Sequence, residues 1–221
     1  MSAISGFFRS SIGKKVVMAL TGVILFGFVI GHMVGNMQIF LGREVLNEYA
    51  VFLRAFGHGG GLWVARTVLI VSAALHVWAA AALTRANMAA RPVGYRLREN
   101  RESTIASRTM RITGVLLVGF LFYHLADFTF GGQNPSFRPH DVYHNVIASF
   151  SVPWISGLYI VAMLLLGLHL YHGVWSMLQT LGLHHPRYNP MRQAFAAIIT
   201  IVIVGGNISF PLAVLTGFVH E

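Results

Sequence analysis

The sequence contains no cysteine and few charged residues. Asp, Glu, Lys and Arg together make up 10% of its 221 residues. The absence of cysteine excludes disulfides, iron–sulfur clusters and covalently attached c-type haem. With 55% hydrophobic residues, the scarcity of charge points away from a soluble globule and indicates a membrane protein. A dinucleotide fingerprint is missing too, since "GHGGG" at 57–61 precedes an apolar run and follows no strand, which indicates a surface turn.

Long apolar runs recur along the chain. Each approaches the ~20 residues that a helix needs to cross ~30 Å of hydrocarbon. The first run follows basic residues, but it is too long for a secretory signal and lacks a small-residue cleavage site. We therefore predict an all-α membrane protein, a single domain over 1–221 with five transmembrane helices in one bundle. These helices are expected at about 16–40, 62–87, 108–130, 154–181 and 192–218.

The net charge of +9 is distributed unevenly along the chain. If five helices alternate in direction, one side receives Arg9, Lys14, Lys15, the seven arginines of 85–111, Arg187 and Arg192. The other side receives only Arg43, Arg54, Arg66 and Arg138. Because basic short loops stay in the cytoplasm, we expect a cytoplasmic N-terminus and a C-terminus outside. The charge thus indicates orientation, and no nucleic-acid partner is expected.

Histidines lie at membrane depth in four of the predicted helices. His32 lies 17 residues after Lys15, and His124 lies 13 after Arg111. At ~1.5 Å per residue, both fall toward the outer half of the bilayer, where they can face each other.

Two further histidines fall toward the inner half. His76 lies nine residues before Arg85, and His169 lies 15 after Trp154, with His172 one turn further on. Histidine pairs at two depths are what two stacked haems need, because each iron takes an imidazole from either face. An iron with imidazole on both sides has no open position for a substrate, so it can only pass electrons.

Small residues flank the predicted ligands. They leave room for a planar porphyrin one turn away, although ordinary close packing of membrane helices is an equal explanation of the glycines. The predicted haem-neighbouring positions are Gly31, Gly35, Ser72, Ala79 and Gly173.

Four segments resemble one known family in their order and spacing. They are "SSIGKKVVMALTG" leading to "GHMVGN", then "ALHVWAA", "FYHLADF" and "LHLYHGVWSM". Together they resemble the five-helix, b558-type cytochrome b membrane anchor of succinate dehydrogenases and fumarate reductases, which carries two b haems. In that family a ligand histidine precedes by four residues a glycine that begins a Gly, apolar, aromatic run. The resemblance therefore selects His169 as the ligand and leaves His172 as a haem neighbour.

The resemblance implies the same pairing as the depth count, His76 with His169 for the inner haem and His32 with His124 for the outer one. It also implies an FAD flavoprotein and an iron–sulfur subunit on the cytoplasmic face of a bacterial inner membrane. The arginine-rich stretch 85–111 is a candidate for that contact, with the positive-inside rule as an equal explanation.

A quinone, menaquinone in enzymes of this form, is implied near the outer haem. Some family members use a carboxylate in the first outer connection for the quinol protons, and Arg54 stands at that place here. Another member-specific acid, two residues before the fourth-helix ligand, is replaced by Gly167. The nearby acids Glu44, Glu48 and Asp127 remain as quinone or proton candidates. For Asp127, a hydrated helix end is the alternative.

Two other functions stay open at this point. One is the cytochrome b of a hydrogenase or formate dehydrogenase, and the other is a cofactor-free transporter or proton channel with histidine relays. The remaining histidine pairs, His140 with His144 and His184 with His185, are expected at the surface.

Overall fold

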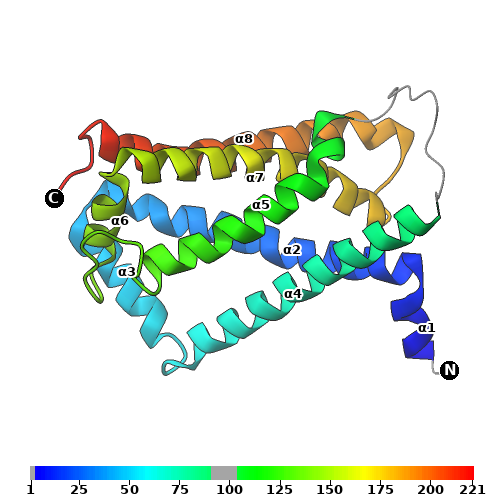
Figure 1. Ribbon diagram of the computed structural model, residues 1–221, viewed down its shortest axis with the longest axis horizontal. Helices are drawn as coiled ribbons and strands as arrows, with labels where there is room; N and C mark the ends of the chain where they lie inside the picture. Colours follow the sequence, from blue (N-terminus) through cyan, green and yellow to red (C-terminus); the bar gives the residue numbers. More distant parts are fainter. Residues whose placement is uncertain (1–2, 91–103) are drawn as a thin grey trace.

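The computed structural model describes residues 3–90 and 104–221, and all regular structure in these ranges is helical (Figure 1). Five helices are long and apolar enough to cross a membrane, which confirms the predicted fold class. They are α2 (Ser11–Asn36), α4 (Gly60–Ala89), α5 (Ile105–Phe128), α7 (Pro153–Thr180) and α8 (Asn189–Leu215).

Short helices lie at both ends of the bundle. They are α1 (Ala3–Arg9), η1 (Met37–Leu41), α3 (Arg43–Ala55), α6 (Val142–Phe150) and η2 (Pro186–Tyr188). Helices α3 and α6 lie with the C-terminus at one end, which we call the α3–α6 end (Figure 1). At the opposite end lie α1, which packs on α2, and the starts of α2 and α5, and we call this the basic end because Lys14, Lys15, Arg85, Arg108 and Arg111 lie there.

Local sequence explains where several helices begin and end. Ser10 caps α2 by accepting a hydrogen bond from the Gly13 N–H, and Thr104 caps α5 through the Ser107 N–H. The last spanning helix was expected to reach residue 218 but ends at Leu215. Gly217 has a φ of 74°, a left-handed conformation that stops helices.

The spanning helices pack in pairs. Helix α2 packs along α4, α5 packs along α7, and α8 packs on the other side of α7. The main contact between the α2–α4 pair and the α5–α7 pair is made by α2 with α7. Among the described residues, the closely packed helix pairs do not include α4 with α5 or with α7.

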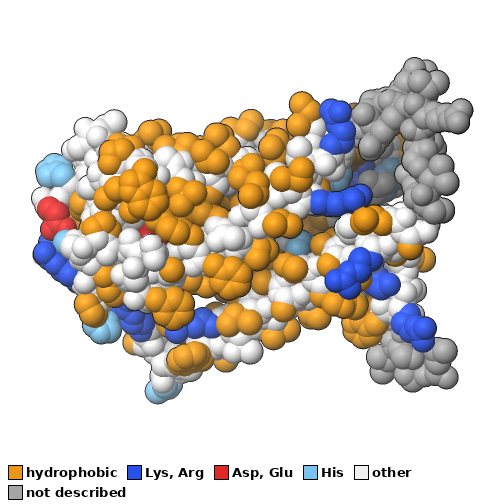
Figure 2. Space-filling model, viewed as in Figure 1, with side chains coloured by type: hydrophobic (Ala, Val, Ile, Leu, Met, Phe, Trp, Pro, Cys, Tyr) orange, Lys and Arg blue, Asp and Glu red, His pale blue; other side chains and the backbone are white. Residues whose placement is uncertain are grey.

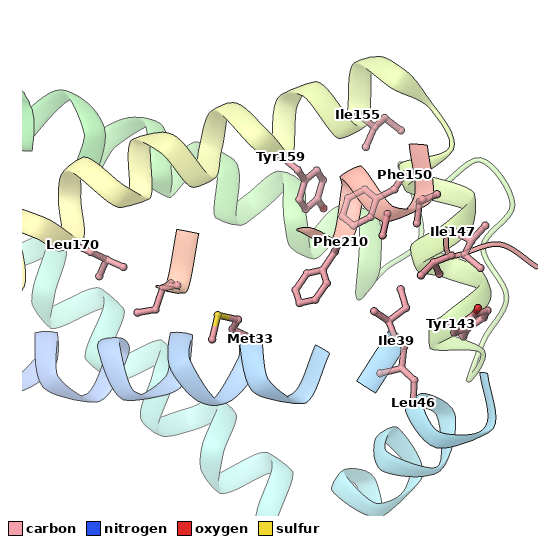
Figure 3. Close-up of a cluster of buried hydrophobic side chains, with 14 residues drawn as sticks. Met33, Ile39, Leu46, Tyr143, Ile147, Phe150, Ile155, Tyr159, Leu170 and Phe210 are labelled. Atoms are coloured by element: carbon pink, nitrogen blue, oxygen red, sulfur yellow. The ribbon is translucent and has the colours of Figure 1, made fainter. Parts of the chain in front are cut away.

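The apolar core is concentrated toward the α3–α6 end. Figure 3 shows Ile39 and Leu46 meeting Tyr143 and Ile147 of α6, with Tyr159 and Phe210 deeper in the bundle. With Met33 of α2, residues from α2, η1, α3, α6, α7 and α8 join in this core, so this end links α2 to α7 and α8.

The outer surface is apolar over the middle of the bundle. Figure 2 shows hydrophobic side chains over the length of the helices, with Lys and Arg gathered toward the ends. Large apolar side chains such as Ile70, Val115, Phe122 and Ile201 are each at least two-thirds exposed. A water-soluble monomer rarely shows such a continuous apolar surface, whereas lipid tails cover it at no cost.

Candidate functional site

His76 of α4 and His169 of α7 face each other in the half of the bundle nearer the basic end. Their ring centroids lie 6.5 Å apart, with an angle of 60° between the ring planes. The two rings meet although their helices are not closely packed, so the side chains alone close the gap.

Each of these rings has a hydrogen-bond partner on a third helix. His76 Nδ1 lies 3.1 Å from the Met18 carbonyl oxygen and 3.2 Å from Thr21 Oγ1, both on α2. His169 Nδ1 lies 3.3 Å from Thr113 Oγ1 on α5. In both residues Nδ1 is occupied by these partners, and Nε2 makes no hydrogen bond to another described residue.

His32 of α2 and His124 of α5 form the second pair, nearer the α3–α6 end. Their ring centroids lie 5.8 Å apart, and the ring planes are almost perpendicular at 87°. His32 Nε2 lies 3.2 Å from the Asn36 side-chain amide nitrogen, which donates, so Nε2 carries the ring's lone pair.

A buried carboxylate, that of Asp127, is linked to His124 through Tyr159. Asp127 is fully buried and accepts hydrogen bonds from Ser149 Oγ at 2.7 Å and from Tyr159 OH at 2.8 Å. The same Tyr159 oxygen lies 3.4 Å from His124 Nδ1. The alternative of a hydrated helix end is therefore wrong for Asp127, because α6 and α7 cover it.

The predicted haem-neighbouring positions separate into two groups. A Cβ built on Gly31 or Gly173 meets no atom within 4 Å, so space is open beside them. At Gly35 a Cβ would lie 2.8 Å from Tyr49 Cε1. Protein atoms also cover Ser72 and Ala79, which are 4% and 0% exposed. At these last three positions helix packing explains the small residue.

Unpaired nitrogens lie on the basic-end halves of α7 and α8. His172 Nδ1, Trp175 Nε1 and two nitrogens of Arg192 are buried without a hydrogen-bond partner in the described part of the chain. Arg192 is only 6% exposed, and its Nη2 donates to Asn189 Oδ1. Buried cations and donors of this kind normally have an acceptor, so the region has unused capacity for an anionic group.

The other quinone or proton candidates lie away from the histidine pairs. Glu44, Glu48 and Arg54 are exposed on α3. Of the four candidates, only Asp127 reaches a histidine of a pair, through Tyr159.

A polar clasp joins α3, α6 and the C-terminus at the α3–α6 end. Asp141 pairs with Arg43 and accepts a hydrogen bond from Asn47 Nδ2 at 2.9 Å, and Glu221 pairs with both Arg43 and His144. The prediction that His144 lies at the surface was wrong, because only 6% of this residue is exposed. Burial acts to raise the pKa of Asp141, but the hydrogen bonds from Asn47 and Arg43 outweigh it and lower this pKa to about 2.

Three partners of the histidines were not singled out from the sequence. Thr21, Thr113 and Tyr159 contact the rings from neighbouring helices. Helical spacing gives a signal for the threonines, because each lies 11 residues, three turns, before the histidine on its own helix. No comparable signal marks Tyr159. Within the described residues, no group of three or more His, Asp or Glu side chains is placed to hold a metal ion by itself.

The fold and the site define a class of helical membrane protein with two facing histidine pairs at different depths inside the bundle. The family described as succinate dehydrogenase/fumarate reductase transmembrane subunit matches residues 89–205, and the chain belongs to this family. The chain is also 27% identical over 188 residues to the succinate dehydrogenase cytochrome b558 subunit of Bacillus subtilis (strain 168), covering 84% of this chain and 86% of that protein. No solved structure matches the chain.

Proposed function

We propose that this chain is a dihaem cytochrome b anchor that passes electrons between the iron–sulfur subunit of a succinate:quinone oxidoreductase and a membrane quinone. The observation that carries the proposal is the presence of two facing histidine pairs at two depths of the bundle. The family and the name of the Bacillus subtilis relative, a cytochrome b558 subunit, support it.

The spacing of the rings fits an iron between each pair. Metal–imidazole bonds of about 2 Å on both sides place two ring centroids about 6 Å apart. The observed distances are 6.5 Å for His76 with His169 and 5.8 Å for His32 with His124. We therefore assign His76 and His169 as axial ligands of one haem b and His32 and His124 as those of the other.

Other residues of the chain fit the remainder of a haem. Open space beside Gly31 and Gly173 suits the porphyrin plane. The unpaired nitrogens of Arg192 and Trp175 suit the propionate carboxylates of the haem nearer the basic end, since a carboxylate accepts several hydrogen bonds.

A bound haem b supplies a one-electron carrier, and with two imidazole ligands it offers no open position to a substrate. The chain's own residues would hold the rings in place, and the partners of His76 and His169 on Nδ1 leave the Nε2 atoms of these two rings free to bind iron. Dicarboxylate chemistry belongs to the rest of the complex, as expected for a transmembrane subunit.

The orientation follows from the charge. The basic end faces the cytoplasm of a bacterial cell, where an FAD flavoprotein and an iron–sulfur subunit dock. Residues 91–103, which make up much of the arginine-rich stretch proposed for this contact, lie outside the described residues. The N-terminus is then cytoplasmic and the C-terminus outside.

The quinone, menaquinone in the family form that the sequence resembles, reacts near the α3–α6 end. Among the proposed residues Asp127 is the best placed, because Tyr159 links its carboxylate to His124. Glu44, Glu48 and Arg54 are exposed on α3 and are the weaker candidates.

Histidine replacements test the assignment. His76→Ala or His169→Ala is expected to remove one haem, His32→Ala or His124→Ala the other, and His172→Ala neither. Pyridine haemochrome analysis and redox titration of the purified complex count the haems that remain. Colourless wild-type protein with adequate haem supply would point to a cofactor-free transporter or channel. Loss of a haem in His172→Ala but not in His169→Ala would overturn the ligand choice.

A further inference from the structure

Residues 21–32 and 113–124 repeat one pattern. The segments TGVILFGFVIGH and TGVLLVGFLFYH share seven of twelve residues, including the initial Thr-Gly-Val, the central Gly-Phe and the final His. The first segment lies in α2 and the second in α5. Both helices begin at the basic end (Figure 1).

The elements that follow each segment also correspond. Helix α2 is followed by short α3 and returning α4, and α5 by short α6 and returning α7. His76 and His169 each lie sixteen residues beyond the first residue of their helix. The chain thus contains two copies of one helical unit in the same direction, the arrangement that membrane proteins relate by an axis along the bilayer normal.

The hydrogen bonds to the histidines repeat as well. Thr21 contacts His76 at 3.2 Å, and Thr113 contacts His169 at 3.3 Å. In each unit the threonine of the first helix therefore reaches the histidine of the returning helix.

The glycine that follows each threonine also lies close to the ring of the histidine that the threonine contacts. A Cβ on Gly22 would lie 3.6 Å from His76 Cε1, and one on Gly114 would lie 3.5 Å from His169 Cε1. The Cε1 edge of each imidazole therefore lies close to the backbone of the neighbouring helix, in van der Waals range of the absent side chain.

Each threonine shares a helix face with a histidine of the other pair. Eleven residues are three turns, so Thr21 and His32 lie on one face about 16 Å apart along α2. The same spacing relates Thr113 to His124 on α5. Helices α2 and α5 therefore each contribute a histidine to the pair nearer the α3–α6 end and a threonine hydroxyl to the pair nearer the basic end.

The partners of His76 fix the position of its proton. The Met18 carbonyl can only accept, so His76 Nδ1 carries a hydrogen and donates. Thr21 Oγ1 lies 2.7 Å from the Val17 carbonyl oxygen, to which it donates, and its lone pairs remain for the imidazole N–H.

Thr113 repeats this chemistry. Its Oγ1 lies 3.1 Å from the carbonyl oxygens of both Thr109 and Met110 and gives its proton to them. It then accepts from His169 Nδ1–H. Both histidines of the pair therefore hold their proton on Nδ1 and leave the Nε2 lone pair free.

We propose that Thr21 and Thr113 are matched positioning residues of the basic-end haem site. Each threonine helps to hold the ring orientation and the Nδ1–H tautomer of its histidine, together with the Met18 carbonyl in the case of His76, and the internal repeat supplies one such threonine to each face of the haem. This inference rests on the proposed function. Such outer hydrogen bonds raise the basicity of a ligating imidazole, which stabilises the ferric over the ferrous state.

Valine replacements in the assembled complex test the inference. Thr21→Val and Thr113→Val keep the side-chain shape and remove the acceptor. Each is expected to weaken the ferric preference of the basic-end haem about tenfold, which raises its potential by about 59 mV for one electron. The potential of the other haem stays unchanged, and Thr21→Ser and Thr113→Ser restore the wild-type value.

Thr200→Val on α8 is the matched control, because Thr200 is also buried but its hydroxyl has no partner among the described residues. Unchanged potentials in both valine variants, or the same shift in Thr200→Val, would overturn the inference. A Thr21→Val complex that loses the basic-end haem, while Thr21→Ser keeps it at the wild-type potential, supports it. Wild-type protein without haem would instead refute the proposed function.

Discussion

The buried Asp127 carboxylate depends on two donors, Tyr159 on α7 and Ser149 on α6. Removing one partner of a buried polar group costs about 1–3 kcal/mol, because the other atom is left without a hydrogen bond. The two donors differ in one respect, since only Tyr159 also contacts His124. Because of this difference, the two donors can be used to separate a structural role of Asp127 from a role at the proposed haem site.

We expect Tyr159→Phe to lower stability by about 1–3 kcal/mol and to shift the potential of the haem that we propose His124 binds. Ser149→Ala is the control, and it is expected to lower stability by a similar amount and leave both potentials in place. Thermal unfolding in detergent and redox titration of the two variants measure these effects. Equal shifts of potential in both variants would contradict the linkage through Tyr159.

Gly35 and Gly31 provide a second matched comparison. A Cβ at Gly35 would collide with Tyr49, so Gly35→Ala is expected to destabilise the packing of α3 by about 1–3 kcal/mol. The added methyl of Gly31→Ala meets no protein atom, so this variant is expected to keep the fold and to lower occupancy of the haem proposed between His32 and His124. Unfolding curves and haem content check both variants. Haem loss in Gly35→Ala at unchanged stability would reverse these roles.

Single residues were predictable to the extent that helix geometry is regular. The depths of His32, His76, His124 and His169 follow from a constant rise per residue, and the structure brings these rings together in the expected pairs. Their identity as ligands stays a prediction. The partners on other helices, such as Tyr159, depend on how helices rotate against one another, which no periodicity specifies.

At the level of helices, the short helices α3 and α6 were the main elements that the sequence did not predict. Helices α3 and α6 have 13 and 9 residues, too short to appear as spans in a hydropathy pattern. Asp127 is nevertheless covered by α6 together with α7, and His144 on α6 is itself buried, so the expectations that these residues contact water were wrong. His144 also pairs with Glu221, a contact across 77 residues that local sequence cannot indicate.

The ion pair and hydrogen bonds of Asp141 in the polar clasp between α3 and α6 predict that the stability of the fold depends on pH. The pKa of Asp141 is lowered to about 2 in the folded state, against about 3.9 in an unfolded chain. Its contribution to stability is therefore complete above about pH 4 and is lost as the pH falls toward 2. Asp141 also caps α6 through the His144 N–H.

We expect Asp141→Ala to lower stability at pH 7 by about 1–2 kcal/mol, with the difference from wild type shrinking below pH 4. Asp141→Asn retains a capping oxygen and is expected to lose less. Thermal unfolding of detergent-solubilised protein at several pH values between 7 and 3 measures this. A constant difference across that range would show that the charge of Asp141 does not contribute.

At the scale of the whole molecule, the proposed orientation can be tested directly because the chain has no native cysteine. Ser11→Cys at the basic end and His220→Cys at the α3–α6 end are both at exposed positions. In intact spheroplasts a membrane-impermeant maleimide is expected to label only His220→Cys, and Ser11→Cys should react only after permeabilisation. The opposite labelling pattern would invert the orientation and move the partner subunits to the other face.

If the chain transfers electrons as proposed, the depth difference between the two histidine pairs makes that transfer sensitive to the membrane potential. Eleven residues along α2 separate the two levels by about 16 Å, roughly half of a ~30 Å hydrocarbon layer. With haem at both levels, one electron moving between them crosses about half of the electric field, worth about 1.2 kcal/mol per 100 mV. In the proposed orientation, an interior-negative potential of that size would favour the electron at the α3–α6 end roughly sevenfold, so the membrane potential of the cell would bias which of the two proposed haems is reduced.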